Sequence, residues 1–321
     1  MLYPLKFSPI LKEKIWGGRK LGEIYNRKDA ENIGESWVLS AFTGSESVVA
    51  NGALKGQPLS SLIDTYKDAL VGKDIYQKFG NNFPLLFKLI DADDKLSIQV
   101  HPNDATAWER HKSFGKTEMW YIIEAEDGSE LTLGFNKNTT PEEYADALAK
   151  GTLETLLHTV KVQAGDAFFI NTGLVHAIGK GILLAEIQQS SDITYRIYDY
   201  QRKDANGHER QLHNQQALDV INYRQSEHTK IIYQKIKNEF VPLVNCKYFK
   251  TSFMEFSNRQ FLDYSETDNF AVLLCVGGQF ELKTVNATLT VAKGEAVMLP
   301  ADTQIVQLLP EQSSKILETI I

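Results

Sequence analysis

Hydrophobic and polar positions alternate over many short stretches of the chain, which is the pattern of β-strands with one buried face. Residues 34–40 and 96–101 alternate in this way, and residues 84–90 form an apolar run typical of a fully buried strand. From residue 242 to the end, short apolar runs are separated by turn residues. The pattern predicts a mainly β protein, built as barrels or jelly rolls with small helical insertions.

Helical spacing of apolar residues is confined to short segments. Residues 59–70 predict one helix. The sequence Thr-Pro-Glu-Glu from Thr140 predicts another, since it offers a capping hydroxyl, a proline in the first turn and acids near the positive end of the helix dipole. We expect that helix to end at Gly151, and further short helices over residues 153–160 and 211–225.

The charged stretch from residue 229 to 241 predicts a domain boundary, with domains at residues 1–235 and 236–321. A weak internal repeat supports two related β-domains. Gly165 and Gly294 each precede an acidic residue, an apolar strand and a turn that begins six residues after the glycine. A histidine, His176, follows the turn only in the first copy, so we expect any metal site to belong to that copy.

Composition excludes some partners. The chain has 321 residues, a net charge of -7 and a pI of about 5.6, which argues against nucleic acid because phosphate backbones need a basic surface. Apolar runs are too short to span a membrane, and the first residues contain no signal-peptide pattern. Cys246 and Cys275 form no motif, so we expect free thiols in a cytoplasmic setting.

The alternation around residue 99 carries the most specific chemistry. Leu96, Ile98 and Val100 share one face of the predicted strand, so Gln99 and His101 lie side by side on the other. Glu118 begins an aromatic strand, and His176 follows the glycine turn. Two imidazoles, a carboxylate and an amide suit zinc and its first-row neighbours.

These residues also carry a resemblance to a known family. The motifs are Trp16-Gly17-Gly18, Gly34-Glu35-Ser36-Trp37, Ser97-Ile98-Gln99-Val100-His101-Pro102, Gly115-Lys116-Thr117-Glu118, His176-Ala177 and the run from Glu186 to Tyr200. Together they resemble class I mannose-6-phosphate isomerases (phosphomannose isomerases) of the short bacterial form, within the cupin superfamily. The likeness covers about residues 1–225 and extends loosely to the end. The chain departs from ordinary cupins, with Gln99 in place of the first histidine of His-x-His and Asn171 in place of a turn proline.

The resemblance implies two cupin-type jelly-roll domains and a zinc-dependent aldose–ketose isomerase that interconverts mannose 6-phosphate and fructose 6-phosphate through an enediolate. By motif match, one zinc ion per chain is expected on Gln99, His101, Glu118 and His176, and Arg196 is expected to be the active-site arginine.

Other residues are candidates for work on the substrate. Lys116 shares a strand face with Glu118, so Lys116 and Arg196 are the predicted cations for phosphate or reacting oxygens. The proton-transferring base stays open between Glu186, His101 and a metal-bound water. Further substrate-binding candidates are Ser97, Trp16 and Glu35, although Trp16 and Glu35 could equally pack the first β-layer.

Two other functions remain open at this point. One is a metal-binding cupin that senses or stores sugar phosphates without catalysis. The other is a cupin oxygenase that uses iron in the same ligand set, since such enzymes use two histidines and one carboxylate. The expected partner is a small sugar phosphate, and the sequence leaves the oligomeric state open.

Overall fold

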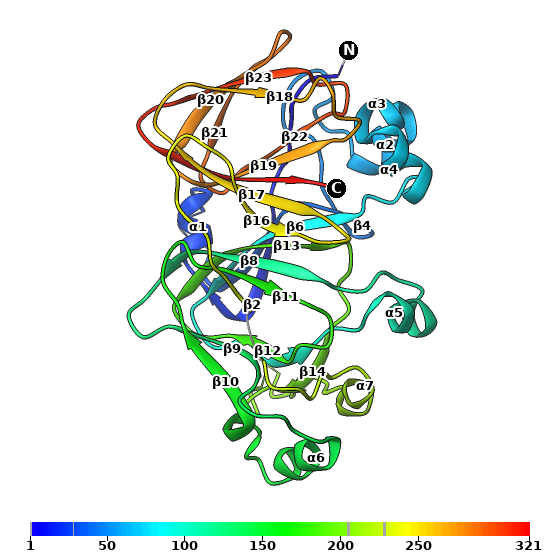
Figure 1. Cartoon of the computed structure of the whole chain (residues 1–321), viewed down its shortest axis with the longest axis vertical. Coiled ribbons are helices and arrows are strands. Elements are labelled where there is room, and N and C mark those ends of the chain that lie inside the picture. Colours follow the sequence, from blue (N-terminus) through cyan, green and yellow to red (C-terminus); the bar gives the residue numbers. More distant parts are fainter. Residues whose placement is uncertain (1, 28, 204–205, 227–228) are drawn as a thin grey trace. The chain divides into compact units, whose positions relative to one another are not determined.

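The computed structural model describes residues 2–27, 29–203, 206–226 and 229–321. The chain forms two compact units, which are described separately (Figure 1). Unit 1 comprises residues 1–11, 36–89 and 232–321, and unit 2 comprises residues 12–35 and 90–231.

This division differs from the predicted domains 1–235 and 236–321. The reason is strand pairing between distant parts of the chain: β1 (Leu5–Lys6) pairs antiparallel with β22 (Ala296–Leu299). The N-terminal residues thereby join the C-terminal sheet of unit 1, a partnership that local hydrophobic patterning does not reveal.

Unit 1 contains two antiparallel sheets, in the orders β1-β22-β19-β24-β17-β16 and β18-β23-β20-β21. Their further strands are β16 (Val241–Asn245), β17 (Lys250–Phe256), β18 (Gln260–Asp263), β19 (Ala271–Gly277), β20 (Gln279–Lys283), β21 (Thr288–Ala292), β23 (Ile305–Pro310) and β24 (Ser314–Ile320). Phe256, Leu273 and Phe280 belong to one buried cluster with residues of both sheets, so the sheets pack face to face as in a jelly roll.

The N-terminal part of unit 1 adds a small hairpin and helices. The hairpin is β4 (Ala41–Phe42) with β5 (Ser45–Glu46). The helix predicted over residues 59–70 is present but divided into α2 (Leu59–Tyr66) and α3 (Asp68–Val71), followed by α4 (Lys73–Phe79). Lys67 divides them because its φ of 49° is incompatible with a continuous right-handed helix.

Unit 2 contains a second pair of antiparallel sheets. One has the order β10-β9-β12-β7-β14, and the other includes the order β15-β11-β8-β13. Their strands are β7 (Ile98–Val100), β8 (Glu118–Ala125), β9 (Glu130–Phe135), β10 (Leu157–Lys161), β11 (Ala167–Ile170), β12 (His176–Ile178), β13 (Ile182–Gln189), β14 (Tyr195–Tyr198) and β15 (Lys230–Ile231).

Three strands pass from one unit to the other along the chain: β2 (Ile10–Gly18), β3 (Ile33–Leu39) and β6 (Leu85–Ala92). The strand β6 confirms the prediction of a buried strand over residues 84–90. Within unit 2, Gly17 of β2 pairs with Ala92 of β6. The short helix α1 (Lys20–Ile24) follows β2 directly.

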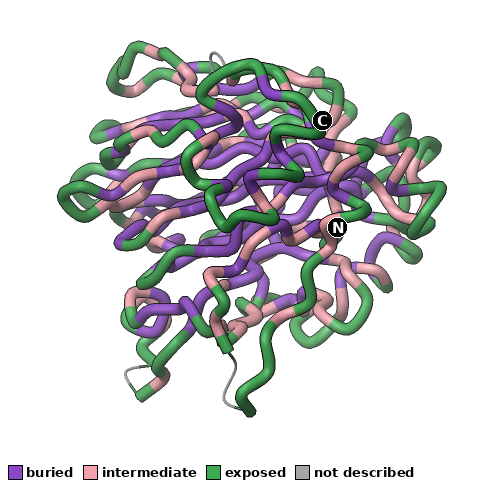
Figure 2. Tube along the Cα trace, turned by 90° about the horizontal axis from the view of Figure 1, so that it is seen from below, coloured by how far each residue is buried: buried purple, intermediate pink, exposed green. Residues whose placement is uncertain are grey.

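Apolar side chains of the two unit 2 sheets form one core. Trp120 and Ile122 of β8, Phe168 of β11, Leu133 of β9 and Ile178 of β12 belong to the same buried cluster. Most strand residues of this core are buried, and Figure 2 shows the buried stretches in the interior of the trace and exposed stretches at its outer turns. The mainly β fold with paired antiparallel sheets confirms the predicted fold class.

A second cluster lies on the opposite face of the β7-containing sheet. It includes Ile98 and Val100 of β7 and residues of the helical insertions, such as Tyr144 and Ala217. The insertions are α5 (Asp104–His111), α6 (Pro141–Ala149), the 3₁₀ helix η1 (Leu153–Leu156) and α7 (Asn214–Leu218). Of these, α6 is the helix predicted from Thr140.

Two predicted helices are present only in part. Residues 153–160 form only η1 before β10 begins, because β10 pairs with β9 and this pairing overrides the helical spacing of the leucines. Over residues 211–225 only α7 is helical. The Asn222 N–H donates to Gly173 O, 2.8 Å away, and Tyr223 O accepts from Thr139 N, so their backbone groups are used outside a helix.

Other predictions concern single positions. Gly165 and Gly294 each lie two residues before a strand, as the internal repeat predicts, and both have positive φ. Cys246 and Cys275 are free thiols.

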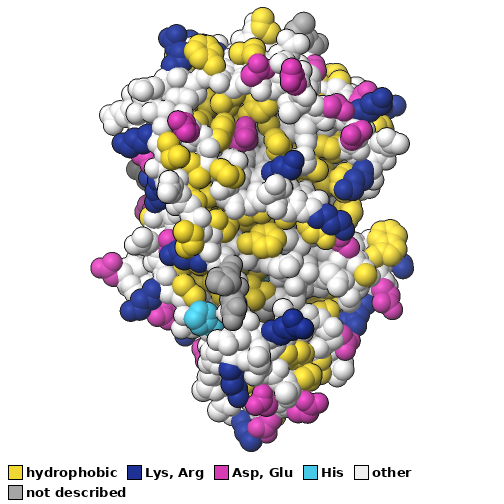
Figure 3. Space-filling model, in the orientation of Figure 1, with side chains coloured by type: hydrophobic (Ala, Val, Ile, Leu, Met, Phe, Trp, Pro, Cys, Tyr) yellow, Lys and Arg dark blue, Asp and Glu magenta, His cyan; other side chains and the backbone are white. Residues whose placement is uncertain are grey.

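The helices of the described residues are all too short or too polar to cross a membrane. On the face drawn in Figure 3, basic and acidic side chains are interspersed.

Candidate metal centre and its surroundings

The register of unit 2 brings three predicted site residues into one row. Gln99 of β7 lies opposite His176 of β12 on one side and opposite Arg196 of β14 on the other. Ile98 and Val100 point to the opposite face and are buried in the cluster beneath the helices. Alternation on β7 therefore turns Gln99 toward the interior between the two sheets.

The facing sheet supplies the carboxylates. Glu118, Trp120 and Ile122 lie on one face of β8, the face whose apolar members belong to the core between the sheets. Trp120 lies opposite Glu186 on β13, and Glu118 lies opposite Gln188. Glu118 and Glu186 are thus held near the row of Gln99 and His176 by two rigid strands.

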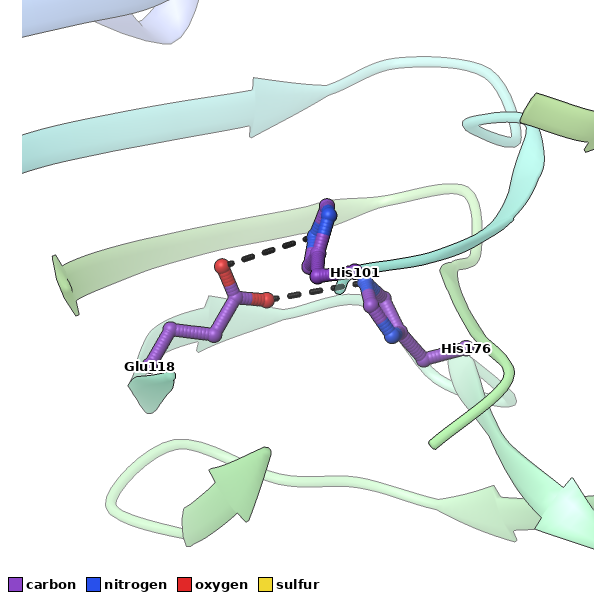
Figure 4. Close-up of side chains that lie close together, drawn as sticks. All are labelled: His101, Glu118 and His176. Atoms are coloured by element: carbon purple, nitrogen blue, oxygen red, sulfur yellow. Dashed lines mark ion pairs between the residues drawn. The ribbon is translucent and has the colours of Figure 1, made fainter. Parts of the chain in front are cut away.

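His101, Glu118 and His176 converge at one point, where their ligand atoms all lie within 4.8 Å of one another. Glu118 Oε2 is 3.8 Å from His101 Nε2, and Glu118 Oε1 is 3.5 Å from His176 Nε2. Figure 4 shows the carboxylate facing both imidazole rings. All three side chains are buried, with at most 1% of each exposed.

Backbone carbonyls fix both imidazoles. His101 Nδ1 is 2.9 Å from Ile193 O, and His176 Nδ1 is 2.8 Å from Leu174 O. Because a carbonyl only accepts, each Nδ1 carries the proton, and each Nε2 keeps its lone pair toward Glu118. Burial also lowers the pKa of His176 to about 4, which favours the neutral ring that metals require.

The donor set fits a divalent cation, and one observation supports this directly. The ammonium of Lys116 lies among the same atoms, 2.7 Å from Glu118 Oε2 and 3.1 Å from His101 Nε2. The buried donors therefore already stabilise a positive charge. The group of His101, Glu118 and His176 could bind a metal ion, as the sequence predicted.

Gln99 is near this group, as predicted, with its Nε2 placed 3.2 Å from His176 Nε2. An amide oxygen and nitrogen exchange places when the side-chain amide turns by half a rotation. Turned in this way, Gln99 presents Oε1 rather than an N–H to the site. Its role as a fourth ligand stays a prediction.

Lys116 and Glu186 border the metal group. Both are buried, and Lys116 Nζ lies 4.0 Å from Glu186 Oε1. Trp120 Nε1 donates a hydrogen bond of 3.0 Å to Glu186 Oε2. The structure thus brings the two predicted catalytic residues together beside the histidines.

Arg196 is half-buried on β14 and its guanidinium is fixed on two sides. Its Nε donates to Ser97 Oγ over 3.3 Å, and its Nη1 donates to Gln211 O over 2.9 Å. In the part of the chain that the structure describes, Nη2 has no hydrogen-bond partner. Burial lowers the pKa of Arg196, although a guanidinium remains charged at physiological pH.

Trp16 and Glu35 have other partners. Trp16 is buried in the core between the sheets, and Glu35 Oε1 lies 3.3 Å from Lys14 Nζ. These contacts match the packing interpretation that the sequence left open. A role for either residue in binding substrate stays a prediction.

The sequence interpretation missed Gln189 and Asp199. Gln189 Oε1 accepts from Thr117 N, and Gln189 Nε2 donates to Asp104 Oδ1, which fixes the segment just before Glu118. Asp199 forms ion pairs with Arg202 and with Arg210. Polar residues within otherwise buried strands are the signal that could have drawn attention to Gln189.

Unit 2 is a protein domain of two antiparallel sheets that enclose a buried group of two histidines and one carboxylate, and this group could hold a metal ion. Residues 4–160 match the family model "Phosphomannose isomerase type I, catalytic domain", and residues 240–311 match "Mannose-6-phosphate isomerase, cupin domain".

Full-length relatives agree with these matches. Mannose-6-phosphate isomerase ManA of Bacillus subtilis is 38% identical over 92% of this chain and 93% of the relative. Mannose-6-phosphate isomerase of Streptococcus mutans is 35% identical over 94% of this chain and 93% of the relative. The crystal structure of the Bacillus subtilis mannose 6-phosphate isomerase superimposes with a TM-score of 0.90 at 31% identity, covering 100% of both chains. This chain belongs to the type I mannose-6-phosphate isomerase family, as its motifs predicted.

Proposed function

We propose that this chain interconverts mannose 6-phosphate and fructose 6-phosphate at the centre formed by His101, Glu118 and His176. The observation that carries the proposal is the convergence of this group with Lys116 and Glu186 in one buried site. Relatives that carry the name of this activity align over more than nine-tenths of the chain.

We propose Zn²⁺ as the metal, with one ion per chain. Two neutral imidazoles and a carboxylate are common zinc ligands, and Gln99 is the proposed fourth. When bound there, zinc would act as a Lewis acid that stabilises negative charge on the sugar oxygens during the reaction. The ammonium of Lys116 would then leave Glu118 and pair with Glu186 instead, whose Oε1 lies 4.0 Å from Lys116 Nζ.

The remaining chemistry belongs to the side chains. Isomerisation moves a proton between C1 and C2 of the open-chain sugar and passes through an enediolate. Glu186 Oε1 is one candidate base, and the hydrogen bond from Trp120 to Oε2 orients its carboxylate. His101 is the other candidate within this chain, and a water on the metal is the third. The choice among them stays open.

Arg196 and Lys116 are the proposed cations for the substrate. Ser97 and Gln211 hold Nε and Nη1 of Arg196, which leaves Nη2 directed to a ligand. A fixed guanidinium can bind phosphate or an enediolate oxygen in one geometry, whereas the flexible ammonium of Lys116 can follow a moving charge.

A coupled assay of mannose 6-phosphate conversion tests this function. We expect turnover that chelation abolishes and that Zn²⁺ or Co²⁺ restores. A non-catalytic sensor would bind the sugar phosphate without forming fructose 6-phosphate. A cupin oxygenase would consume oxygen only with iron, so an oxygen electrode separates that alternative. Absence of turnover in protein that contains one equivalent of zinc would overturn the proposal.

A further inference from the structure

Asp199 is a buried carboxylate that holds two arginines just beyond β14. Arg210 forms a bidentate ion pair with Asp199: its Nε donates to Oδ2 over 2.7 Å, and its Nη2 donates to Oδ1. Arg202 Nη2 donates to the same Oδ1 over 2.7 Å. Only 5% of Asp199 is exposed, so this is a specific, largely desolvated contact rather than a surface ion pair.

Arg210 is directly followed in the chain by the residues that hold Arg196. Gln211 O accepts the hydrogen bond from Arg196 Nη1. His213 is joined to the Arg196 backbone twice: its N–H donates to Arg196 O over 2.7 Å, and its Nδ1 accepts from Arg196 N over 3.2 Å. The bidentate ion pair between Arg210 and Asp199 therefore fixes one end of the segment 210–213, which orients the guanidinium of Arg196.

The charges favour the same arrangement. Burial alone would raise the pKa of Asp199, but hydrogen bonds from Arg210 and Arg202 hold that pKa below its ordinary value. Asp199 is thus ionised at neutral pH and balances the charges of Arg202 and Arg210. Without it, three guanidinium groups would repel one another, and Arg196 would be displaced most easily because its Nη2 has no protein partner in the described structure.

We propose that Asp199 and Arg210 are positioning residues for Arg196. Their ion pair fixes the segment 210–213, so that Gln211 O and Ser97 Oγ aim Nη2 toward the substrate. The inference rests on the proposed function, because it assigns the substrate contact to Arg196. In the described structure neither residue has a hydrogen bond or ion pair with His101, Glu118 or His176, so we expect their loss to act on the reaction through Arg196.

The test is a double-mutant cycle of Asp199→Asn with Arg196→Lys, measured as kcat and KM in the zinc-loaded enzyme. Asp199→Asn keeps the size of the side chain but removes its charge, and we expect kcat/KM to fall about tenfold, since small misplacement of a positioning group is costly. In the Arg196→Lys background the same change should alter kcat/KM by less than about twofold, because the residue that Asp199 positions is already lost.

The matched control is Asp219→Asn, which breaks the exposed Asp219–Arg110 ion pair in the same unit and should leave kcat/KM unchanged. Metal content and melting temperature are measured for every variant. Wild-type kinetics in Asp199→Asn, or equal losses in both backgrounds, would overturn the positioning role.

A second readout does not depend on activity. In protein labelled with ¹⁵N-arginine, the Nε–H signal lost in Arg196→Lys identifies Arg196. Asp199→Asn should shift this signal, and Asp219→Asn should not. An inactive wild type with a shifted signal would contradict the proposed function and keep the positioning inference, whereas an unshifted signal would overturn the inference.

Discussion

At the residue scale, His101 and His176 carry the central chemical claim. Their Nε2 atoms face Glu118 because each Nδ1–H is bound to a backbone carbonyl. We predict that His101→Ala or His176→Ala releases the metal, because each change removes one of the two imidazole donors and fewer protein donors bind zinc more weakly. Elemental analysis after gel filtration measures this. The control is the exposed His158→Ala, which should retain one equivalent, and one equivalent in His101→Ala would refute the ligand assignment.

Arg196 is the second residue whose replacement should affect the reaction without affecting metal binding or folding. We predict that Arg196→Lys keeps metal content and melting temperature but lowers kcat/KM at least about tenfold, or about 1.4 kcal/mol of transition-state stabilisation. A lysine cannot donate to Ser97, Gln211 and a ligand from one planar group. Steady-state kinetics should show the loss mainly in kcat if Arg196 acts at the reacting carbons, and mainly in KM if it anchors phosphate. The exposed Arg224→Lys is the control, and wild-type kinetics in Arg196→Lys would remove Arg196 from the site.

The buried state of His176 also predicts how stability depends on pH. Its folded pKa of about 4 lies below its ordinary 6.5, so between these values the unfolded chain binds a proton that the folded protein does not. The free energy of unfolding of the metal-free protein should therefore fall as the pH falls from 6.5 toward 4, by at most about 1.4 kcal/mol per pH unit from this group. Urea unfolding at pH 7 and 5.5 measures the change. If the free energy of unfolding of His176→Gln depended on pH as strongly as that of the wild type, the pH dependence would come from other groups.

At the element scale, α6 offers the clearest test of local sequence signals. The Thr140 hydroxyl accepts from Glu143 N, and the Glu143 carboxylate accepts from Thr140 N, so the predicted helix start is a complete capping box. We predict that Thr140→Ala lowers the free energy of unfolding by about 1 kcal/mol. Thr140→Ser keeps the hydroxyl and should lose much less. Equal losses in urea unfolding would show that the cap contributes nothing.

Single elements also show which features local sequence patterns can predict and which they cannot. The cap of α6 and the alternation around Gln99 were predictable because each depends on neighbours within a few residues. Residues 153–160 were misread because the partner that makes Leu157 a strand residue is Phe135, which local spacing cannot show. The pairing of Asp199 with Arg210 was missed for a related reason, since the two residues are eleven positions apart in the sequence and belong to no common pattern.

At the scale of the whole molecule, strand pairing decides which segments form each unit. The sequence predicted a mainly β chain and the members of the metal group, because motifs carry those features. It did not predict that residues 5–6 pair with residues 297–298, because that contact joins segments nearly three hundred residues apart. The repeat after Gly294 lacks a counterpart of His176, so the C-terminal segment stays predicted to hold no metal.

The measurement that tests the account most directly is a titration of metal-free protein with Zn²⁺, with isomerase activity on mannose 6-phosphate followed at each addition. The account predicts that activity rises linearly and stops at one equivalent per chain, and that His176→Ala shows no such rise. Full activity in the metal-free protein, or a break at two equivalents, would contradict the claim that a single metal at His101, Glu118 and His176 supports the reaction.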